Sequence, residues 1–203
     1  MKLTTGFTHG LSFGLLLLAV ILLSKCATDI QTSPDPGVLK VILYSDPADT
    51  QIVILSKTFT VSSSDYFGVT VFQGKVFSGE KFAFLYKDKM SYRQEDVTYN
   101  IIERKEGRYQ EFTIFDSYVP PGDYTSLQFG LNSNQVKIGY LEIPVKLPVG
   151  DNPIRKLEQV FTVKENEVTE IKVQISPFKS VKRYRDSYQF IPELKIVEIN
   201  HYR

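Results

Sequence analysis

Apolar and polar residues alternate with a period of two along much of the chain after residue 37. In segment 169–175, Thr, Ile, Val and Ile occupy the odd positions and Glu, Lys and Gln the even ones. Neighbouring residues of a strand point to opposite faces, so this pattern predicts a strand with one buried face. Leu127, Phe129 and Leu131 repeat the pattern. No segment keeps a 3.6-residue period, so we expect little helix.

Further apolar segments alternate with turn signals at short intervals. The turn signals include Ser45–Asp49, Gly74, Ser78–Gly79, Glu106–Gly107 and Pro120–Asp123. This spacing is typical of an all-β antiparallel sandwich. The expected strands cover residues 38–44, 52–55, 58–61, 67–72, 81–86, 97–103, 111–116, 127–131, 136–145, 157–163, 169–175 and 188–199.

Three finer features follow from glycine, asparagine and proline. The alternation of segment 136–145 changes phase near Gly139, which predicts a β-bulge there. Glu165–Asn166 predicts a hairpin turn. Pro192 has no backbone N–H, so it predicts that part of the last strand lies at a sheet edge.

The chain divides into three predicted regions. Residues 1–25 have a basic start and an apolar run over 11–23. That run is too short to span a bilayer but is typical of a secretory signal. Residues 26–37 are polar and contain two prolines, which predicts a flexible tether. Residues 38–203 form the predicted sandwich domain.

Cys26 is the only cysteine of the chain and directly follows this region. The segment Leu23-Ser24-Lys25-Cys26 resembles a bacterial lipobox, in which the cysteine is acylated and becomes the mature N-terminus. Lys25 stands where that pattern has a small residue. The alternatives are an ordinary signal peptide with an incidental thiol, or an uncleaved anchor. The resemblance implies attachment to a membrane through a lipid on Cys26.

Composition argues against a charge-driven partner. The chain has 24 basic and 23 acidic residues, and two of the basic ones, Lys2 and Lys25, lie within the predicted signal. The mature chain is therefore nearly neutral, whereas nucleic acid binding favours a clear basic excess. A single cysteine leaves no disulfide to stabilise the domain, so the core must do so alone.

The residues needed for common catalytic sites are missing. The only histidines are His9, within the predicted signal, and His201, near the C-terminus. No histidine–nucleophile pair, zinc cluster or phosphate-binding loop can be assembled from the sequence. We therefore expect neither enzymatic activity nor a cofactor or metal. Asp46 and Asp49 could bind Ca²⁺ together, but an Asp-Pro turn capped by its own side chain is the preferred interpretation.

Two segments are candidates for ligand binding. Tyr118 and Tyr124 flank the Pro-Pro-Gly turn, and Lys182, Arg183, Tyr184 and Arg185 form the densest basic run. Tyrosines can stack on sugar rings and basic residues can contact anionic groups. The competing interpretation is that the tyrosines are strand residues and that the basic run is a solvated sheet edge. The predicted ligand is a glycan or a protein.

Three ordered segments resemble a family of bacterial envelope lipoproteins known only as a domain of unknown function. They are Val41–Asp49, with its Asp-Pro-Ala turn, Val119–Leu127, with its Pro-x-Gly-x-Tyr-like turn, and the closing part from Phe161 to Leu194. The resemblance implies a transthyretin- or prealbumin-like β-sandwich, within the immunoglobulin-like topology class. It implies no catalytic residue.

Together these features predict a non-catalytic, lipid-anchored protein of the cell envelope that serves binding, adhesion or a structural role. The alternative is a carbohydrate-binding or carbohydrate-acting accessory lipoprotein. We expect a lipid-anchored location in the cell envelope, at the outer membrane or cell surface rather than the inner membrane.

Acylation of Cys26 can be tested directly. Mass spectrometry of the mature N-terminal peptide should find a chain that begins at Cys26 and carries acyl groups. Cys26→Ala should leave the domain folded but release it from the membrane, because each buried CH₂ of the lipid contributes about 0.8 kcal/mol to anchoring. An unmodified N-terminus downstream of Cys26 would rule the prediction out.

Overall fold

The computed structural model describes residues 33–203, and Pro34–Arg203 form one compact unit. Every regular element in this range is a strand. The predicted all-β class is confirmed. The predictions for the signal, for Cys26 and for most of the tether lie outside the described residues. The transthyretin-like topology implied by the resemblance stays a prediction.

The strands have the following bounds: β1 Gly37–Ser45, β2 Gln51–Ile54, β3 Lys57–Thr60, β4 Tyr66–Ser78, β5 Lys81–Phe84, β6 Val97–Asn100, β7 Arg104–Lys105, β8 Arg108–Tyr109, β9 Glu111–Val119, β10 Gly122–Ile138, β11 Leu141–Lys146, β12 Ile154–Val163, β13 Val168–Ile175, β14 Val181–Tyr184, β15 Ser187–Phe190 and β16 Leu194–Tyr202.

One sheet has the strand order β16-β13-β1-β9. β1 runs parallel to β13 and antiparallel to β9, and β13 runs antiparallel to β16. β1 is apolar almost throughout because it lies in the middle of this sheet, where Leu39, Val41 and Leu43 are fully buried. The predicted alternation of 169–175 is confirmed: Ile171, Val173 and Ile175 are also fully buried.

The larger sheet is built on the pairing of its two longest strands, β4 and β10. The first part of β10 also pairs with β12, and its last part pairs with β11. β5 and β6 pair with β4 on its other side, and the β14–β15 hairpin joins through a short parallel contact between β15 and β11. Two small hairpins, β2–β3 and β7–β8, complete the structure.

The core lies between the two sheets. Phe115 of β9 packs edge-on against Phe129 of β10, with ring centroids 6.1 Å apart. Phe67 makes a similar contact with Phe190 at 5.8 Å. Gly74 lies inside β4 and not in a turn. A glycine is needed at this position because a Cβ atom would meet the Phe115 ring at 2.5 Å. The turn predicted at Gly74 is therefore wrong.

Three other predictions are corrected by the topology. Gly139 and Tyr140 form the two-residue turn between β10 and β11, so the change of phase marks a hairpin and not a bulge. Gly139 has φ +58°, which a glycine adopts easily at the first central position of such a turn. Glu165–Asn166 is a turn, but it joins strands of different sheets. Pro192 separates β15 from β16, so the single strand predicted over 188–199 is two strands of different sheets, although β16 does lie at a sheet edge as predicted.

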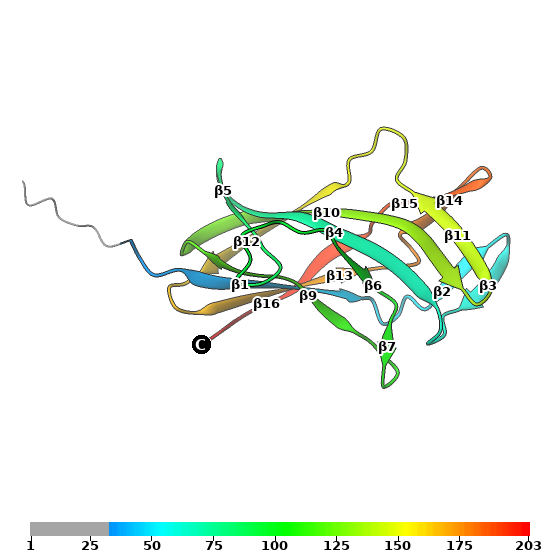
Figure 1. Ribbon diagram of the computed structural model, residues 1–203, viewed down its shortest axis with the longest axis horizontal. Coiled ribbons are helices and arrows are strands. Elements are labelled where there is room, and N and C mark those ends of the chain that lie inside the picture. Colours follow the sequence, from blue (N-terminus) through cyan, green and yellow to red (C-terminus); the bar gives the residue numbers. More distant parts are fainter. Residues whose placement is uncertain (1–32) are drawn as a thin grey trace, which may run out of the picture. The chain divides into compact units, whose positions relative to one another are not determined.

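The domain has two ends with different elements (Figure 1). We call the first the tether end: β1 begins there at Gly37, which pairs with Val119, and β16 finishes there. We call the other the hairpin end, where β1 finishes and the β2–β3, β10–β11 and β14–β15 turns lie. A lipid anchor preceding residue 37 would attach at the tether end.

The outer face of the smaller sheet carries charges that compensate one another. Lys40 Nζ lies 3.0 Å from Glu170 Oε2, and the Tyr202 hydroxyl donates to the same oxygen at 3.0 Å. Lys172 lies between Glu111 and Glu198, at 3.5 and 3.6 Å. Burial alone would raise the pKa of Glu170, but the hydrogen bonds from Lys40 and Tyr202 and the nearby lysine charges outweigh it. Its pKa is therefore lowered.

Glu170→Gln should remove part of the acid sensitivity of the fold. A carboxylate with a lowered folded-state pKa stabilises the fold fully above its ordinary pKa of 4.5. This stabilisation is lost as the pH falls through the lowered value. Urea unfolding at neutral pH and below pH 4.5 should therefore show a smaller loss of stability in the variant than in the wild type. Glu80→Gln, at an exposed turn position, is the control and should behave as the wild type. If the free energy of unfolding depended on pH equally in all three proteins, the lowered pKa of Glu170 would be contradicted.

Candidate functional site

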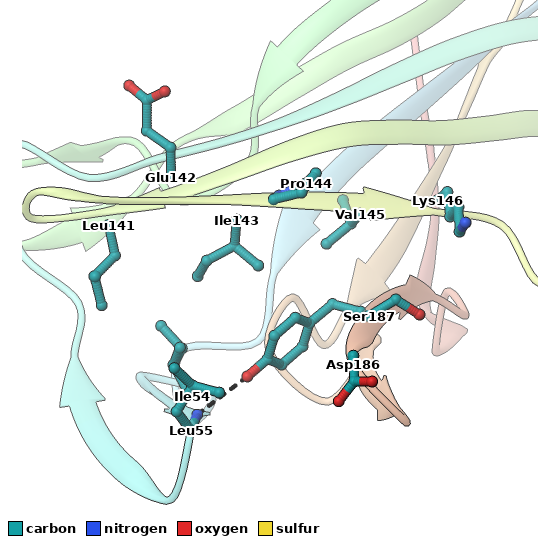
Figure 2. Close-up of a pocket in the computed structure, with 11 residues that line it drawn as sticks. Ile54, Leu55, Leu141, Glu142, Ile143, Pro144, Val145, Lys146, Asp186 and Ser187 are labelled. Atoms are coloured by element: carbon teal, nitrogen blue, oxygen red, sulfur yellow. Dashed lines mark hydrogen bonds between the residues drawn. The ribbon is translucent and has the colours of Figure 1, made fainter.

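An apolar pocket of about 430 Å³ opens at the hairpin end. We call it the hairpin pocket. Three separate segments form it: the tip of the β2–β3 hairpin, the whole of β11 and the start of β15 (Figure 2). Its volume lies within the range of about 300–1,000 Å³ found for small-molecule sites. The lining residues are Ile54, Leu55, Leu141, Glu142, Ile143, Pro144, Val145, Lys146, Asp186, Ser187 and Tyr188.

The alternation of β11 makes one wall of the pocket apolar. Figure 2 shows Leu141, Ile143 and Val145 pointing toward the β2–β3 tip, whereas Glu142 points to the opposite side of the strand. Pro144 has no N–H to offer to a further strand, and β15 joins β11 only at Val145 and Lys146. The edge of β11 beside Leu141 and Ile143 therefore faces the pocket and not another strand of the sheet.

The opposite wall is the tip of the β2–β3 hairpin. Leu55 and Ser56 form its two-residue turn, and both have positive φ values of 46° and 69°. Asparagine and glycine are the preferred residues of such a turn, whereas a leucine with positive φ is strained. Leu55 is also 67% exposed, so neither backbone geometry nor core packing favours a leucine here. Strained residues of this kind cluster at functional sites.

Tyr188 connects the two walls. Its hydroxyl oxygen accepts a hydrogen bond from the Leu55 backbone N–H at 3.1 Å, the dashed line in Figure 2. The hydroxyl keeps its own proton for donation. No protein acceptor for that proton is found within residues 33–203. The pocket thus combines apolar walls with the donor hydroxyl of Tyr188.

A second hollow, of about 470 Å³, lies against the other side of the β2–β3 hairpin. Val53 and Leu55 line it together with Lys182 and Arg183 from β14. Val53 is 60% exposed. The tip of the hairpin therefore separates an apolar pocket from a hollow with basic residues.

The structure separates the six predicted binding residues into two groups. Tyr118 lies on β9 near the tether end and is 55% exposed, with Lys89 Nζ 6.0 Å from its ring centroid. Tyr124 is only 4% exposed, stacks on Phe161 and donates its hydroxyl to the Pro120 carbonyl at 2.6 Å. Burial raises the pKa of the Tyr124 phenol. Tyr124 belongs to the core, which argues against its predicted binding role, although it also lines a hollow of about 360 Å³ with Pro120 and Pro121.

The basic run lies at the hairpin end, on the β14–β15 hairpin. Lys182 forms an ion pair of 2.7 Å with Glu193. Arg183 donates to the Arg185 carbonyl at 3.1 Å, and the Arg185 guanidinium lies 5.3 Å from the Tyr184 ring centroid. These residues are exposed and partly engaged with one another. Of the predicted set, they are the ones that lie beside the hairpin pocket.

The two aspartates of the first turn have structural roles. Asp46 Oδ1 accepts from the Ala48 N–H at 3.0 Å, which is the self-capped turn expected. Asp49 is buried, and its Oδ2 accepts from the backbone N–H groups of Phe178 and Lys179 at 2.8 and 3.1 Å. Over residues 33–203, no group of three acidic, histidine or cysteine residues could hold a metal ion.

The polar groups of the pocket lining are the side chains of Glu142, Lys146, Asp186, Ser187 and Tyr188. The lining includes no histidine and no cysteine. His201 lies on β16, pairs across the sheet with Thr169 and contacts its hydroxyl at 3.2 Å, toward the tether end. The two carboxylates of the lining, Glu142 and Asp186, come from different elements, and Glu142 points away from the cavity (Figure 2).

Sequence reasoning missed the residues of the hairpin pocket. The sequence predicts a strand over 52–55 and one strand with a bulge over 136–145, and neither pattern indicates a pocket. One signal was present: the segment Ile52-Val53-Ile54-Leu55-Ser56 contains no glycine, asparagine or proline where a turn must form. A turn without these residues forces positive φ on side chains that disfavour it, which is a reason to look at the segment.

No family model, curated protein or solved structure matches this chain. Within residues 33–203, no helix is present that could cross a membrane.

Replacing Leu55–Ser56 by Asn–Gly should stabilise the fold. The two residues suit positive φ values, so the free energy of unfolding should rise by about 0.5–1 kcal/mol. Glu106→Asn is a matched control, because Glu106 has φ 54° in the β7–β8 turn, away from the pocket. Urea unfolding should show stabilisation at both sites. A loss of stability on changing Leu55 and Ser56 alone would mean that Leu55 is kept for the fold and not for a ligand.

Proposed function

We propose that this chain is a non-catalytic, lipid-anchored protein of the cell envelope that binds an apolar ligand in the hairpin pocket. The observation that carries the proposal is the apolar pocket of about 430 Å³ beside a strained, exposed leucine. A protein that needed this hairpin only for folding would gain stability from Asn–Gly at its tip. The presence of Leu55 where a turn with positive φ favours asparagine or glycine supports a role in contact with another molecule.

The pocket chemistry supports a ligand with an apolar body and one hydrogen-bond acceptor. Leu141, Ile143 and Val145 would cover the apolar body, and burial of its surface would contribute about 25 cal/mol per Å². The O–H group of Tyr188, which has no protein acceptor among the described residues, would donate a hydrogen bond to a carbonyl, ether or carboxylate oxygen of the ligand. The ligand could be a small molecule or an apolar side chain of a partner protein, and a basic rim formed by Lys182 and Arg183 lies nearby.

The position of the pocket supports display away from a membrane. β1 begins at the tether end, and the pocket lies at the hairpin end of the same unit (Figure 1). A lipid on Cys26 would hold the tether end toward the bilayer and leave the pocket accessible. Attachment to the outer membrane or the cell surface remains part of the proposal, as does the transthyretin-like topology.

The carbohydrate-binding alternative has less support. Six tyrosines are exposed, but none of their rings stacks on another within the described residues. Residues 33–203 therefore present no contiguous platform of exposed tyrosine rings on which a sugar chain could stack. The exposed tyrosines are Tyr66, Tyr92, Tyr118, Tyr140, Tyr184 and Tyr202.

Filling the pocket should abolish binding of an apolar ligand. We expect unlipidated residues 27–203 to bind the neutral fluorescent probe N-phenyl-1-naphthylamine. Leu141→Trp should weaken this binding by about ten-fold or more, equivalent to about 1.4 kcal/mol. The chain has no tryptophan of its own, so the new indole should also transfer excitation to any bound probe.

The control is Val149→Trp, at a loop position that is 98% exposed. This variant should bind the probe as the wild type does. Thermal unfolding of both variants separates loss of the pocket from loss of the fold. Equal probe binding by a folded Leu141→Trp and by the wild type would overturn the pocket assignment.

A further inference from the structure

Aromatic side chains gather on the outer face of the larger sheet, near the tether end. Phe77 of β4 packs against Phe82 of β5 at 5.8 Å between ring centroids, and Phe82 packs against Phe84 at 5.1 Å. Phe82 and Phe84 are 48% and 43% exposed. Alternation places these two residues on the solvent face of β5, because Ala83 between them is the more buried one.

Lysines lie among these rings. Lys75 Nζ is 4.6 Å from the Phe82 centroid and 5.3 Å from the Phe84 centroid. Lys156 Nζ is 5.8 Å from the Phe77 centroid, but it is paired with Glu158 at 2.7 Å. Lys75 and the exposed Lys81 have no carboxylate within ion-pair distance among the described residues. We call Lys75, Phe77, Phe82 and Phe84, together with the exposed Lys81 at the first position of β5, the Phe–Lys patch.

The patch is adjacent to the start of the domain. Phe82 and Lys81 line a hollow of about 360 Å³ together with Pro120 and Pro121. Val119, the residue before these prolines, pairs with Gly37 at the start of β1. Only ten residues separate Cys26 from Gly37, so even a fully extended chain spans no more than roughly 40 Å between them.

We propose that the Phe–Lys patch rests on the headgroup surface of the bilayer that carries the lipid on Cys26. Phenylalanine rings with flanking lysines suit this surface, because the rings enter the boundary of the acyl region while the ammonium groups remain at anionic headgroups. The short distance to the anchor raises the effective concentration of the patch at the bilayer, so a weak surface contact suffices. The inference rests on the anchoring part of the proposed function.

This contact would orient the domain. With the Phe–Lys patch on the bilayer, β5 and the outer face of β4 lie toward the membrane. The hairpin pocket lies at the opposite end of the β4–β10 pair (Figure 1), so this contact leaves it uncovered. A tether alone would leave the orientation of the domain undetermined.

The test uses the single cysteine and the absence of tryptophan. Residues 26–203 are coupled through the Cys26 thiol to a maleimide lipid in vesicles of phosphatidylcholine and phosphatidylglycerol. This coupling replaces cellular acylation, so the result does not depend on whether Cys26 is acylated in the cell. Both sheets and the core lie within Pro34–Arg203, so the segment contains the whole folded unit. Phe84→Trp reports on the patch, and Tyr140→Trp, at a position 88% exposed in the β10–β11 turn, is the matched control.

We expect brominated lipids to quench Phe84→Trp at least twice as strongly as Tyr140→Trp, with a blue shift of emission only for Phe84→Trp. Adding Lys75→Glu and Lys81→Glu to the Phe84→Trp variant should reduce the quenching to the level of the control. Equal quenching at the two positions, or quenching unaffected by the lysine changes, would overturn the proposal. Two further outcomes, both measured without vesicles, would also overturn the proposal. The same blue shift on raising the protein concentration would identify a second copy of the chain as the partner. The same blue shift on adding dextran sulfate would identify a polyanion as the partner.

Discussion

The pairing of β4 with β10 is the interaction on which the rest of the structure depends. These strands, of 13 and 17 residues, are the longest of the domain. Each is long enough to pair with two further strands at different positions along its length. β10 pairs first with β12 and then with β11, and β4 pairs with β6 and with β5. One continuous pair therefore supports the Phe–Lys patch at the tether end and the hairpin pocket at the other end. Register shifts within the pair let both strands bend around the core.

The outer faces of the two sheets differ in their electrostatics. On the smaller sheet, Lys40, Glu170 and Lys172 compensate one another, and the hydrogen bond to Glu170 raises the pKa of Lys40. A partner that bound this face through its charges would have to break these ion pairs, so the face is better suited to stabilising the domain than to binding. On the larger sheet, the aromatic rings near β5 have lysines but few carboxylates beside them. Their exposed apolar area is not needed for the fold, which makes an external contact the simpler explanation.

Anchoring, orientation and ligand binding fit together as one arrangement. In the proposed arrangement, the lipid would fix the position of the domain, the Phe–Lys patch would set its orientation, and the hairpin pocket would stay uncovered. Each element uses a different physical effect: transfer of acyl chains into the bilayer, contact of aromatic and basic side chains with headgroups, and burial of an apolar ligand group beside the Tyr188 hydroxyl.

The sequence by itself determined the fold class and much of the core. Alternation in segment 169–175 and around Leu127 is a local property, since a strand must bury one face wherever it pairs. Turns with positive φ were equally readable at Gly79, Gly107 and Asn166, because few residues other than glycine and asparagine adopt that geometry readily.

Only the tertiary structure decided which segments meet. The hairpin pocket is formed by residues near positions 55, 143 and 188. These segments are far apart in the sequence, and no local pattern predicts that they lie together. Tyr124 and Tyr118 have the same residue type and nearly the same position in sequence, yet one is in the core and the other is exposed. Phe82 and Phe84 follow the alternation expected of a strand, but their aromatic face points to solvent. The physical reason is that alternation fixes which residues share a face, whereas the pairing of strands and the packing of sheets decide which face is buried.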